Sequence, residues 1–266
     1  MNIQKSKVDD AISHLVQYFS DNEWFINSFW GENEDRVRAM VSDAVSLVPP
    51  DQNTRVLDIG CFNGFASFIF GFVGYRVTAS DEVDFAERHA LLNRVGAAFH
   101  QANFNHLDAF HDFPDETFDI VVMGEVIEHV LNHPVGLMKN VARIMQQDGL
   151  LILTTPNPAT IMNAIRLLRN RGVTRGSVEF ADMPKVDSEG NLISYGGIHY
   201  REYPSSELDN LLSKAGFRLE HRRFIPIGAS GVQSFLRRTV KGNAITRHLL
   251  HTRLLGATQY CLARRV

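Results

Sequence analysis

The sequence predicts an α/β fold built on a mostly parallel sheet of seven strands with helices on both faces. From residue 55 onward, short and nearly continuous apolar runs alternate with amphipathic helical stretches. This alternation is typical of parallel strands that are buried on both faces. The 266 residues are 44% hydrophobic and include 18 Phe, so the chain can bury a sizeable core and disorder is excluded as its main state.

The first 50 residues are predicted to form a helical cap, ahead of a single α/β domain over residues 51–266. Apolar residues at helical spacing indicate a first helix. A second helix is expected from about Asn33 to Leu47, where Pro49 and Pro50 end it. A cluster of aromatic side chains lies between the two helices: Trp24, Phe25, Phe29 and Trp30.

The next hundred residues supply five predicted strands and three predicted helices. The strands are expected at Arg55 to Ile59, Arg76 to Ala79, Ala98 to Ala102, Phe118 to Met123 and Leu150 to Thr154. The helices are expected at Gly64 to Phe72, Phe85 to Val95 and Pro134 to Met145. Strands that are joined by crossover helices of this length lie parallel in one sheet.

Two more strands complete the predicted sheet, at Phe217 to Ile225 and at Thr258 to Ala263. A helix from Ser205 to Ala215 precedes them, and Gly216 is suited to end it. Two insertions without a readable motif, residues 161–200 and 233–255, separate these elements. We expect the insertions to cover the ligand-binding side of the sheet as lids.

The most specific motif is Asp58-x-Gly60-x-x-x-Gly64, which ends the first predicted strand and leads into a helix. Glycines let the backbone turn tightly and let a ligand approach, and open α/β sheets bind ligands at this end of their strands. The dinucleotide fingerprint G-x-G-x-x-G would require glycine where Phe62 stands, and the Asp58 carboxylate would repel a phosphate. The motif therefore favours a cationic ligand without phosphate, such as S-adenosylmethionine, over a dinucleotide, and an ordinary glycine-rich turn stays the alternative.

From Arg55 to Asn157, and again from His199 to Glu220, the chain resembles class I S-adenosylmethionine-dependent methyltransferases. The resemblance is to the group that contains ubiquinone-pathway, small-molecule and sugar O-methyltransferases. It rests on the glycine motif and on four further motifs in the same order: Val77-Thr78-Ala79-Ser80-Asp81, Phe118-Asp119-Ile120-Val121-Val122-Met123 followed by Gly124-Glu125-Val126-Ile127-Glu128-His129-Val130, Asp148-Gly149-Leu150-Leu151-Ile152-Leu153-Thr154-Thr155-Pro156-Asn157, and His199-Tyr200-Arg201-Glu202-Tyr203.

The resemblance implies a Rossmann-like fold, S-adenosyl-L-methionine as cofactor and S-adenosyl-L-homocysteine as product. Asp81 would bind the ribose, because a carboxylate accepts well from two vicinal hydroxyls. Asn103 and Phe104 would contact the adenine, although the family often has an acid at this place and Asn103 could instead cap a turn. The remaining cofactor-binding residues, at the methionine end, would be Asp58, Gly60, Cys61, Phe62, Gly64 and Gly124.

Methyl transfer to a hydroxyl requires that the methyl acceptor be held in line and that its proton be removed. The candidate catalytic residues are Glu125, His129 and His199. His129 could act as the general base, because its unperturbed pKa lies near neutrality, or it could hold the turn after the fourth strand in shape. His199 could reach the methyl site from the lid side or be an ordinary loop residue. The Trp24 to Trp30 cluster and a helix starting at Pro158 are expected to close the site as a lid.

The same region suggests a metal site as an alternative. Residues Glu125, Glu128 and His129 are spaced to share one face of a helix, with His199 as a distant fourth ligand. Carboxylate and imidazole together suit Mg²⁺, Mn²⁺ or Zn²⁺. The arrangement is similar to that of small-RNA terminal 2′-O-methyltransferases. It also occurs in relatives for which no metal is implied, so we assign no metal ligand.

The sequence thus predicts an S-adenosylmethionine-dependent methyltransferase that acts on a hydroxyl of a small molecule or sugar. Two alternatives stay open. One is an enzyme acting on an RNA end or a lipid-linked methyl acceptor through the basic C-terminal segment. The other is a non-catalytic module that binds the cofactor as a sensor or scaffold.

The net charge of −3 conceals an uneven distribution. Nine of the 27 Lys and Arg residues, but none of the 30 Asp and Glu residues, follow Glu220. Such asymmetry can indicate an anionic partner or a membrane surface. We favour neutralisation of the acidic core, within the chain or across a homodimer, and expect no nucleic-acid partner. Peripheral membrane contact through this segment stays open.

Cysteine content and hydropathy limit the class of protein further. Cys61 and Cys261 are the two cysteines, which excludes a disulfide scaffold and a four-cysteine zinc module. The first residues lack the apolar run of a signal peptide, and no stretch of 18 apolar residues occurs. We therefore expect a soluble, cytoplasmic protein.

Overall fold

Strands and helices alternate along most of the chain. The computed structural model describes residues 3–20, 30–84, 86–173, 184–186, 192–195, 198–226 and 251–266. The elements in chain order are α1 (Ile3–Tyr18), α2 (Gly31–Leu47), β1 (Arg55–Ile59), α3 (Phe65–Val73), β2 (Arg76–Asp81), α4 (Ala86–Asn93), β3 (Ala98–Gln101), β4 (Phe118–Gly124), the short 3₁₀ helix η2 (Ile127–His129), α5 (Pro134–Ile144), β5 (Met145–Pro156), α6 (Ile161–Leu168), β6 (Pro184–Val186), β7 (Leu192–Tyr195), α7 (Ser205–Lys214), β8 (Phe217–Ile225) and β9 (Thr258–Arg265).

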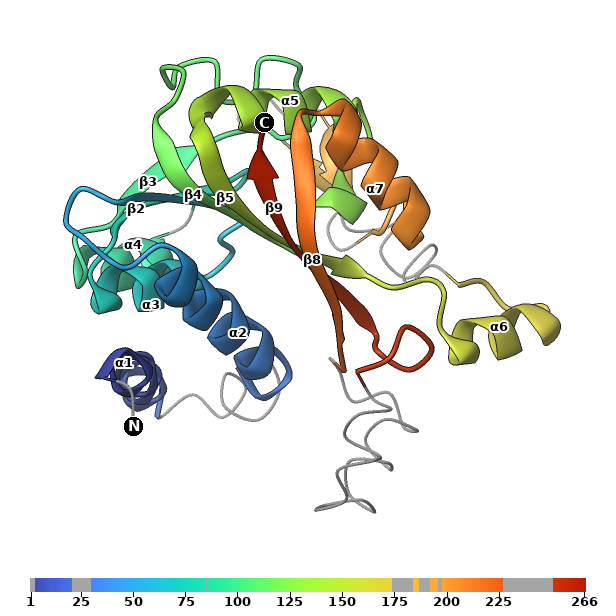
Figure 1. The fold of residues 1–266 in the computed structure, drawn as a ribbon, viewed down its shortest axis with the longest axis horizontal. Helices are drawn as coiled ribbons and strands as arrows, with labels where there is room; N and C mark the ends of the chain where they lie inside the picture. Colours follow the sequence, from blue (N-terminus) through green and yellow to red (C-terminus); the bar gives the residue numbers. More distant parts are fainter. Residues whose placement is uncertain are drawn as a thin grey trace.

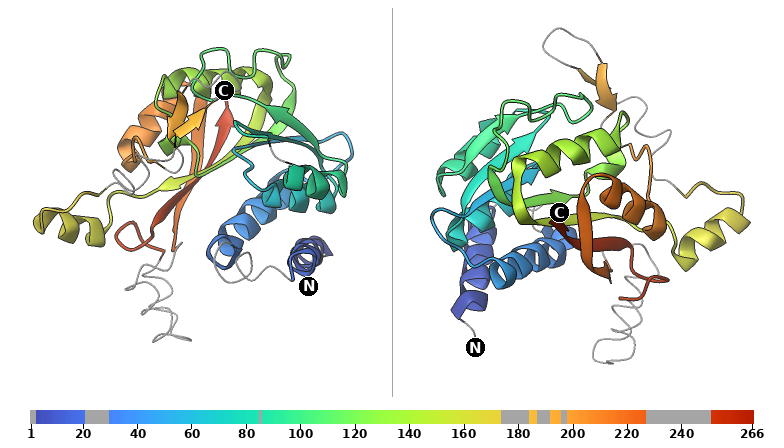
Figure 2. Two further views of the ribbon diagram at one scale, coloured as in Figure 1. Left: turned by 180° about the vertical axis from the view of Figure 1, so that it is seen from behind. Right: turned by 45° about the horizontal axis from the view of Figure 1, so that its top comes forward.

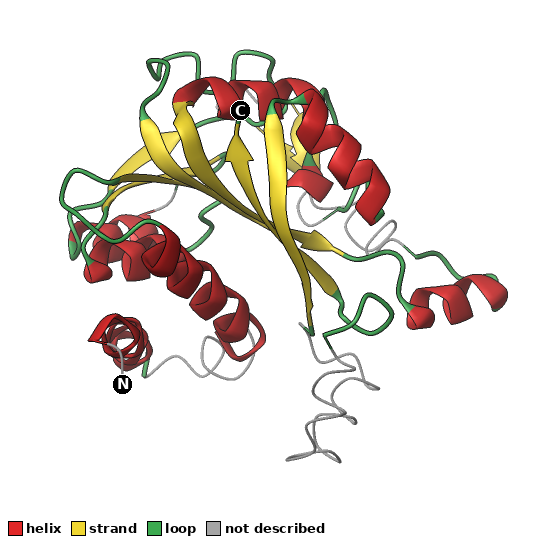
Figure 3. Cartoon of the chain, in the orientation of Figure 1, coloured by secondary structure: helices red, strands yellow, loops and turns green. Residues whose placement is uncertain are grey.

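Seven strands form one twisted sheet in the order β3-β2-β1-β4-β5-β9-β8 (Figures 1 and 3). The neighbours from β3 to β5 pair in parallel, whereas β9 runs antiparallel to both β5 and β8. The predicted seven-stranded, mostly parallel sheet is therefore confirmed. The strand order reverses at β1, which pairs with β2 on one side and with β4 on the other.

Helices cover both faces of the sheet (Figures 1 and 2). Helices α1 to α4 lie on one face, and α5 and α7 lie on the other. Side chains of a strand alternate between the two layers: Val56 of β1 joins the core under α1 to α4, whereas Leu57 and Ile59 join the core under α5 and α7. All three of these side chains are fully buried.

The helical cap is fastened to the far half of the sheet through Asp43 of α2. Its Oδ2 accepts hydrogen bonds from the Tyr260 hydroxyl of β9 at 2.7 Å and from Nη2 of Arg223 of β8 at 2.6 Å. The Arg223 guanidinium also lies over the Tyr260 ring, 4.1 Å from its centroid. These contacts hold α2 across the carboxyl ends of β4 and β5, so the cap forms part of the ligand-binding side.

The first insertion contains secondary structure of its own in its described residues. Residues 161–200 contain α6 and a separate two-stranded sheet of β6 and β7. The helix expected to start at Pro158 starts at Ile161, because the Thr160 hydroxyl accepts from the Asn163 N–H and caps the helix there. Figures 1 and 2 show α6 projecting beyond β8, and none of its residues is buried.

Other expectations fall outside the described residues. These include Trp24, Phe25 and Phe29 of the aromatic cluster and most of the second insertion, 233–255. Trp30 is described and is buried in the core. None of the described helices combines the length and the apolar character that crossing a membrane requires.

Candidate active site

A cavity of about 590 Å³ opens at the carboxyl ends of β1, β2 and β4. Its walls are the loop after β1, the residue that ends β2, the turn after β4 and one face of α2. This is the point where the strand order reverses, and open α/β sheets bind ligands in the crevice at such a point. The volume lies in the range of small-molecule and cofactor sites.

The glycine loop has the backbone shape that its motif predicts. Gly60 has a φ of 71° and Gly64 a φ of 79°, both in the left-handed region. A Cβ added at Gly60 would lie 2.3 Å from Cγ2 of Val126, so this position also requires the smallest residue. Gly60, Cys61 and Phe62 line the cavity, whereas Gly64 caps the start of α3 behind it.

Asp58 forms a buried acidic floor of the cavity. Its side chain lies near the end of β1, the residue is 3% exposed, and Oδ2 accepts from the Ser67 hydroxyl at 2.6 Å. Burial raises the pKa of Asp58 from 3.8 to about 6, and the hydrogen bond from Ser67 opposes that rise. A cationic ligand placed here would favour the ionised carboxylate.

Asp81 ends β2 and joins two loops at the cavity wall. Its Oδ2 accepts from the Phe62 N–H at 2.8 Å, and its Oδ1 accepts from the Val83 N–H at 3.2 Å. An ionised carboxylate has about four lone-pair positions, so both oxygens can still accept from further hydroxyls. The side chain lines the cavity and is 15% exposed.

The two residues expected at the adenine take different places. Phe104 is 6% exposed and lines the cavity. The Asn103 side chain accepts from the Asn105 N–H at 3.0 Å, which is the turn-capping arrangement, and Asn103 is absent from the cavity wall. The structure therefore brings Phe104, but not Asn103, to the cavity.

Arg36 of α2 lines the cavity, although it belongs to none of the motifs that predict the site. Its Nη1 donates to the Thr154 hydroxyl of β5 at 3.4 Å, and its Nη2 donates to Oδ1 of Asn33 at 2.5 Å. It is the one Lys or Arg among the described residues that line the cavity. A Cβ added at Gly124 would lie 2.8 Å from Nη1 of Arg36, so the guanidinium packs closely against the end of β4.

The turn after β4 differs from the expected helix. Glu125 has a φ of 59°, in the left-handed region, and helical geometry begins only at Ile127. The expectation that Glu125, Glu128 and His129 share one helical face is therefore wrong, because the backbone at Glu125 is left-handed and Glu125 lies outside the helical turn. Glu125 lines the cavity, and its Oε1 is buried without a hydrogen-bond partner among the described residues.

Glu128 is fully buried behind the cavity and connects η2 to the segment after the first insertion. Its Oε2 accepts from the Thr155 hydroxyl at 3.0 Å, while Oε1 has no hydrogen-bond partner within the described chain. Its backbone carbonyl accepts from the Tyr200 N–H at 2.8 Å and from the Arg201 N–H at 3.3 Å. Burial, and then the neighbouring charge of Glu125, raise the pKa of Glu128 well above its ordinary value.

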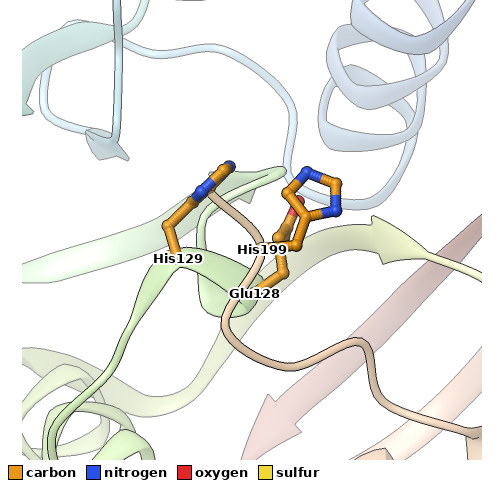
Figure 4. Close-up of side chains that lie close together, drawn as sticks. All are labelled: Glu128, His129 and His199. Carbon is orange, nitrogen blue, oxygen red and sulfur yellow. The ribbon is translucent and has the colours of Figure 1, made fainter. Parts of the chain in front are cut away.

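His129 and His199 meet beside Glu128 (Figure 4). Their rings are 4.9 Å apart between centroids and stand at 78° to each other. Nδ1 of His129 lies 2.7 Å from the Ile198 carbonyl oxygen, and Nδ1 of His199 lies 2.9 Å from Oε1 of Glu202. In the neutral form of each ring, an N–H at Nδ1 that donates to this oxygen places the lone pair on Nε2.

These three side chains can act on one small group. Glu128, His129 and His199 each offer one ligand atom, and these atoms all lie within 4.8 Å of one another. An oxygen atom between them would be within hydrogen-bond reach of all three, and a divalent cation could occupy the same place. His129 lines the cavity, so the cluster borders the cavity at the turn after β4.

Comparison with known proteins agrees with this architecture. A family model described as a methyltransferase domain matches residues 29–222, well over half of the chain. The chain belongs to this methyltransferase family. The match begins just before α2 and ends within β8, so it includes the cap helix that carries Arg36.

The individual proteins that match this chain are moderately similar to it and match only part of it. A ubiquinone biosynthesis O-methyltransferase of Glaesserella parasuis is 34% identical over 108 residues, which are 39% of this chain and 45% of the relative. A protein of Mycobacterium tuberculosis named as a probable S-adenosylmethionine-dependent methyltransferase is 28% identical over 171 residues, 64% of this chain and 51% of the relative. The chain thus spans about half the length of these curated relatives.

The fold is shared with solved methyltransferase structures. A crystal structure of a SAM-dependent methyltransferase from Archaeoglobus fulgidus superposes with a TM-score of 0.53 at 16% identity, covering 90% of this chain and all of that one. At this identity the likeness supports the Rossmann-like fold alone.

Proposed function

We propose that this methyltransferase transfers the methyl group of S-adenosyl-L-methionine to a hydroxyl of a small molecule or sugar. One observation carries the proposal. The cavity at the strand-order reversal is bordered at one side by the glycine loop with Asp58 and Asp81, and at the other by His129. A cofactor subsite and a proton-accepting group thus face a single space.

The residues of the cavity fit this cofactor. The buried Asp58 and the unpartnered Oε1 of Glu125 suit a ligand with positive charge. Arg36 suits the carboxylate of the methionine part, Asp81 suits the ribose hydroxyls, and Phe104 offers a ring face to the adenine. When bound, S-adenosylmethionine supplies a methyl group on a positively charged sulfur. The sulfur is an activated leaving group, because it departs as the neutral thioether of S-adenosylhomocysteine. Gly60, Cys61, Phe62 and Gly124 border the same subsite.

The role proposed for His129 is that of general base. The Ile198 carbonyl at Nδ1 directs the lone pair to Nε2, and the residue borders the cavity. A positioned base of this kind contributes typically 10²–10⁴-fold to a rate. His199, held by Glu202 and touching the His129 ring, is the alternative base.

The second interpretation of this cluster is that Glu128, His129 and His199 bind a divalent cation. It is favoured by the close approach of the ligand atoms and by the buried, unpartnered Oε1 of Glu128. Histidines that bind metals usually give their other ring N–H to a carboxylate or a carbonyl, as both could do here. Metal analysis of the purified protein, together with activity assays in the presence of a chelator, distinguishes the cation site from a general base without metal. Unchanged activity and no bound metal would exclude the cation.

The decisive experiment for the function is untargeted mass spectrometry of cell extract incubated with the protein and isotopically labelled S-adenosylmethionine. We expect the label in a small molecule or sugar, as a mass increase of one labelled methyl group. Label that appears only in RNA or lipid would favour the alternative methyl acceptors. Binding of S-adenosylhomocysteine without labelling of any pool would favour a non-catalytic module.

The proposal extends to partners and location. The curated relatives named as ubiquinone biosynthesis O-methyltransferases favour a small-molecule methyl acceptor. We propose a cytoplasmic location and no nucleic-acid partner. Homodimerisation and peripheral membrane contact are to be measured by light scattering and by vesicle sedimentation.

A further inference from the structure

Arg88 of α4 is buried behind the cofactor subsite. It is 1% exposed, and it is absent from the residues that line the cavity. Removing a guanidinium from water costs free energy that an apolar side chain of similar size would not cost, so a buried Arg is weak evidence for stability. Stability alone therefore does not explain why an arginine is buried at this position, and its contacts indicate a functional role.

The Arg88 guanidinium contacts three separate parts of the subsite. Nη1 donates to Sγ of Cys61 in the glycine loop at 3.3 Å. Nη2 donates to the carbonyl of Val83 in the loop after β2. Nη1 also lies 3.9 Å from Oδ2 of Asp81, and the guanidinium carbon lies 4.3 Å from the centroid of the Phe99 ring.

Arg88 and Asp81 both form hydrogen bonds with the same two loops. Asp81 accepts backbone N–H groups from Phe62 in the glycine loop and from Val83 in the loop after β2. Arg88 donates to Cys61 and to Val83 in those loops. The planar guanidinium can reach several acceptors at fixed angles, which a lysine ammonium cannot do from one place.

Arg88 also supplies a positive charge next to a group of carboxylates at the cavity. Asp58, Asp81 and Glu82 all line the cavity, and the charge of Asp81 contributes to the raised pKa of Asp58. These carboxylates repel one another across the space that a cofactor would fill. Arg88 places a positive charge behind Asp81 without occupying the cavity.

We propose that Arg88 is a positioning residue for the ribose subsite. It holds the Asp81 carboxylate and the glycine loop in the arrangement that binds the nucleoside part of the cofactor. The inference rests on the proposed function, because it presumes that S-adenosylmethionine binds in this cavity.

The first test compares Arg88→Met with a control on the same segment, Arg94→Met. Arg94 is exposed and lies over the Tyr18 ring, away from the subsite. Calorimetry with S-adenosylhomocysteine is expected to show at least a tenfold weaker affinity for Arg88→Met and an unchanged affinity for Arg94→Met. The Tm of Arg88→Met is expected to stay within about 5 °C of wild type, because Asp81 is partly exposed and keeps its two N–H donors.

A double substitution tests whether Arg88 acts through Asp81. In an Asp81→Asn background, Arg88→Met is expected to weaken the affinity by less than about twofold further, because two residues acting as one unit are not additive. Fully additive losses would overturn the proposal. If Arg88→Met does not fold, Arg88→Lys decides: weaker binding supports the proposal, and wild-type affinity overturns it.

The outcomes separate this inference from the proposed function. Wild-type protein that binds S-adenosylhomocysteine, together with an Arg88→Met variant that binds within twofold of it, would overturn the inference alone. Wild-type protein that binds no S-adenosylhomocysteine would overturn the proposed function and this inference with it.

Discussion

The Asp58 carboxyl group is buried in the folded protein, so it loses most of the water that surrounds it in the unfolded chain. Its pKa of about 6, against an ordinary value of 3.8, means that the folded protein holds a proton that the unfolded chain releases between these two values. The free energy of unfolding should therefore fall as the pH rises from about 4 to about 6, by roughly 3 kcal/mol for this group.

The same titration predicts how cofactor binding depends on pH. A ligand with a positively charged ammonium prefers the ionised Asp58, so its affinity should be about tenfold weaker at pH 5 than at pH 8. Calorimetry with S-adenosylhomocysteine across this range measures the effect. The Asp58→Asn variant is the control, and we expect its affinity to be weaker and nearly independent of pH. An equal pH dependence in both proteins would show that another group is responsible.

Gly60 allows two separate effects of a side chain to be measured. Alanine at φ 71° costs about 1–2 kcal/mol of backbone strain, and its Cβ would also meet Val126 at 2.3 Å. Gly96, at φ 65° with no atom within 4 Å of an added Cβ, is the matched control for strain alone. In denaturant unfolding, Gly60→Ala should lose more stability than Gly96→Ala, and only Gly60→Ala should weaken S-adenosylhomocysteine binding.

A second change identifies the contact. Combining Gly60→Ala with Val126→Ala removes the clashing methyl group and should recover part of the affinity. Equal losses in Gly60→Ala and Gly96→Ala would contradict the close-approach argument.

At the residue scale, the sequence predicts those site residues that follow from strand ends. Asp58, Asp81 and Gly124 come at the carboxyl ends of predicted parallel strands, which share one edge of the sheet. Arg36 could not be placed in the same way, because its position depends on how a distant helix packs across that edge. A polar pair at helical spacing within an apolar stripe, Asn33 and Arg36 beside Val37 and Met40, is the signal that could have indicated it.

At the scale of elements, apolar runs predict the positions of strands well, but a strand that contains a polar stretch is predicted too short. The predicted bounds of β1 and β8 agree with the structure. The fifth strand was predicted at Leu150 to Thr154, yet β5 runs over Met145–Pro156. Its first half is polar, and it stays in the sheet through an irregular register with β4 between Phe118 and Ile120. A bulge of this kind leaves no simple pattern in the sequence.

Helix α2 depends on Asp43 for its place, and this contact can be tested. Asp43→Ala removes an acceptor from both Arg223 and Tyr260 and should cost about 1–3 kcal/mol of stability. Because α2 carries Arg36, the affinity for S-adenosylhomocysteine should fall as well. Hydrogen exchange should become faster in α2 but stay slow in β4. Ser46→Ala, at an exposed position of the same helix, should change none of these quantities.

At the scale of the whole molecule, the two ends of the basic C-terminal segment belong to the folded sheet, as the end of β8 and as β9. Strand β9 lies between β5 and β8, so this segment is no free tail. Four of the five basic residues that the structure describes after Glu220 form ion pairs with acidic residues of the preceding chain: Arg222 with Asp209, Arg223 with Asp43, Arg264 with Glu220 and Arg265 with Glu116. The positive charge of the described residues of this segment is thus largely neutralised within the chain.

This neutralisation predicts the behaviour of the protein toward RNA. A free cationic surface would release counterions on binding, and its affinity would fall steeply with salt in a log–log plot. Because the described arginines of the segment are mostly paired, we expect affinity for a single-stranded RNA of 20 nucleotides no tighter than about 10⁻⁴ M at physiological salt, the weak end of non-specific binding. Fluorescence anisotropy between 50 and 200 mM salt, about the range over which such contacts are lost, measures it. Micromolar affinity with a steep salt slope would contradict this neutralisation, and label from S-adenosylmethionine appearing in RNA would then be required to assign an RNA methyl acceptor.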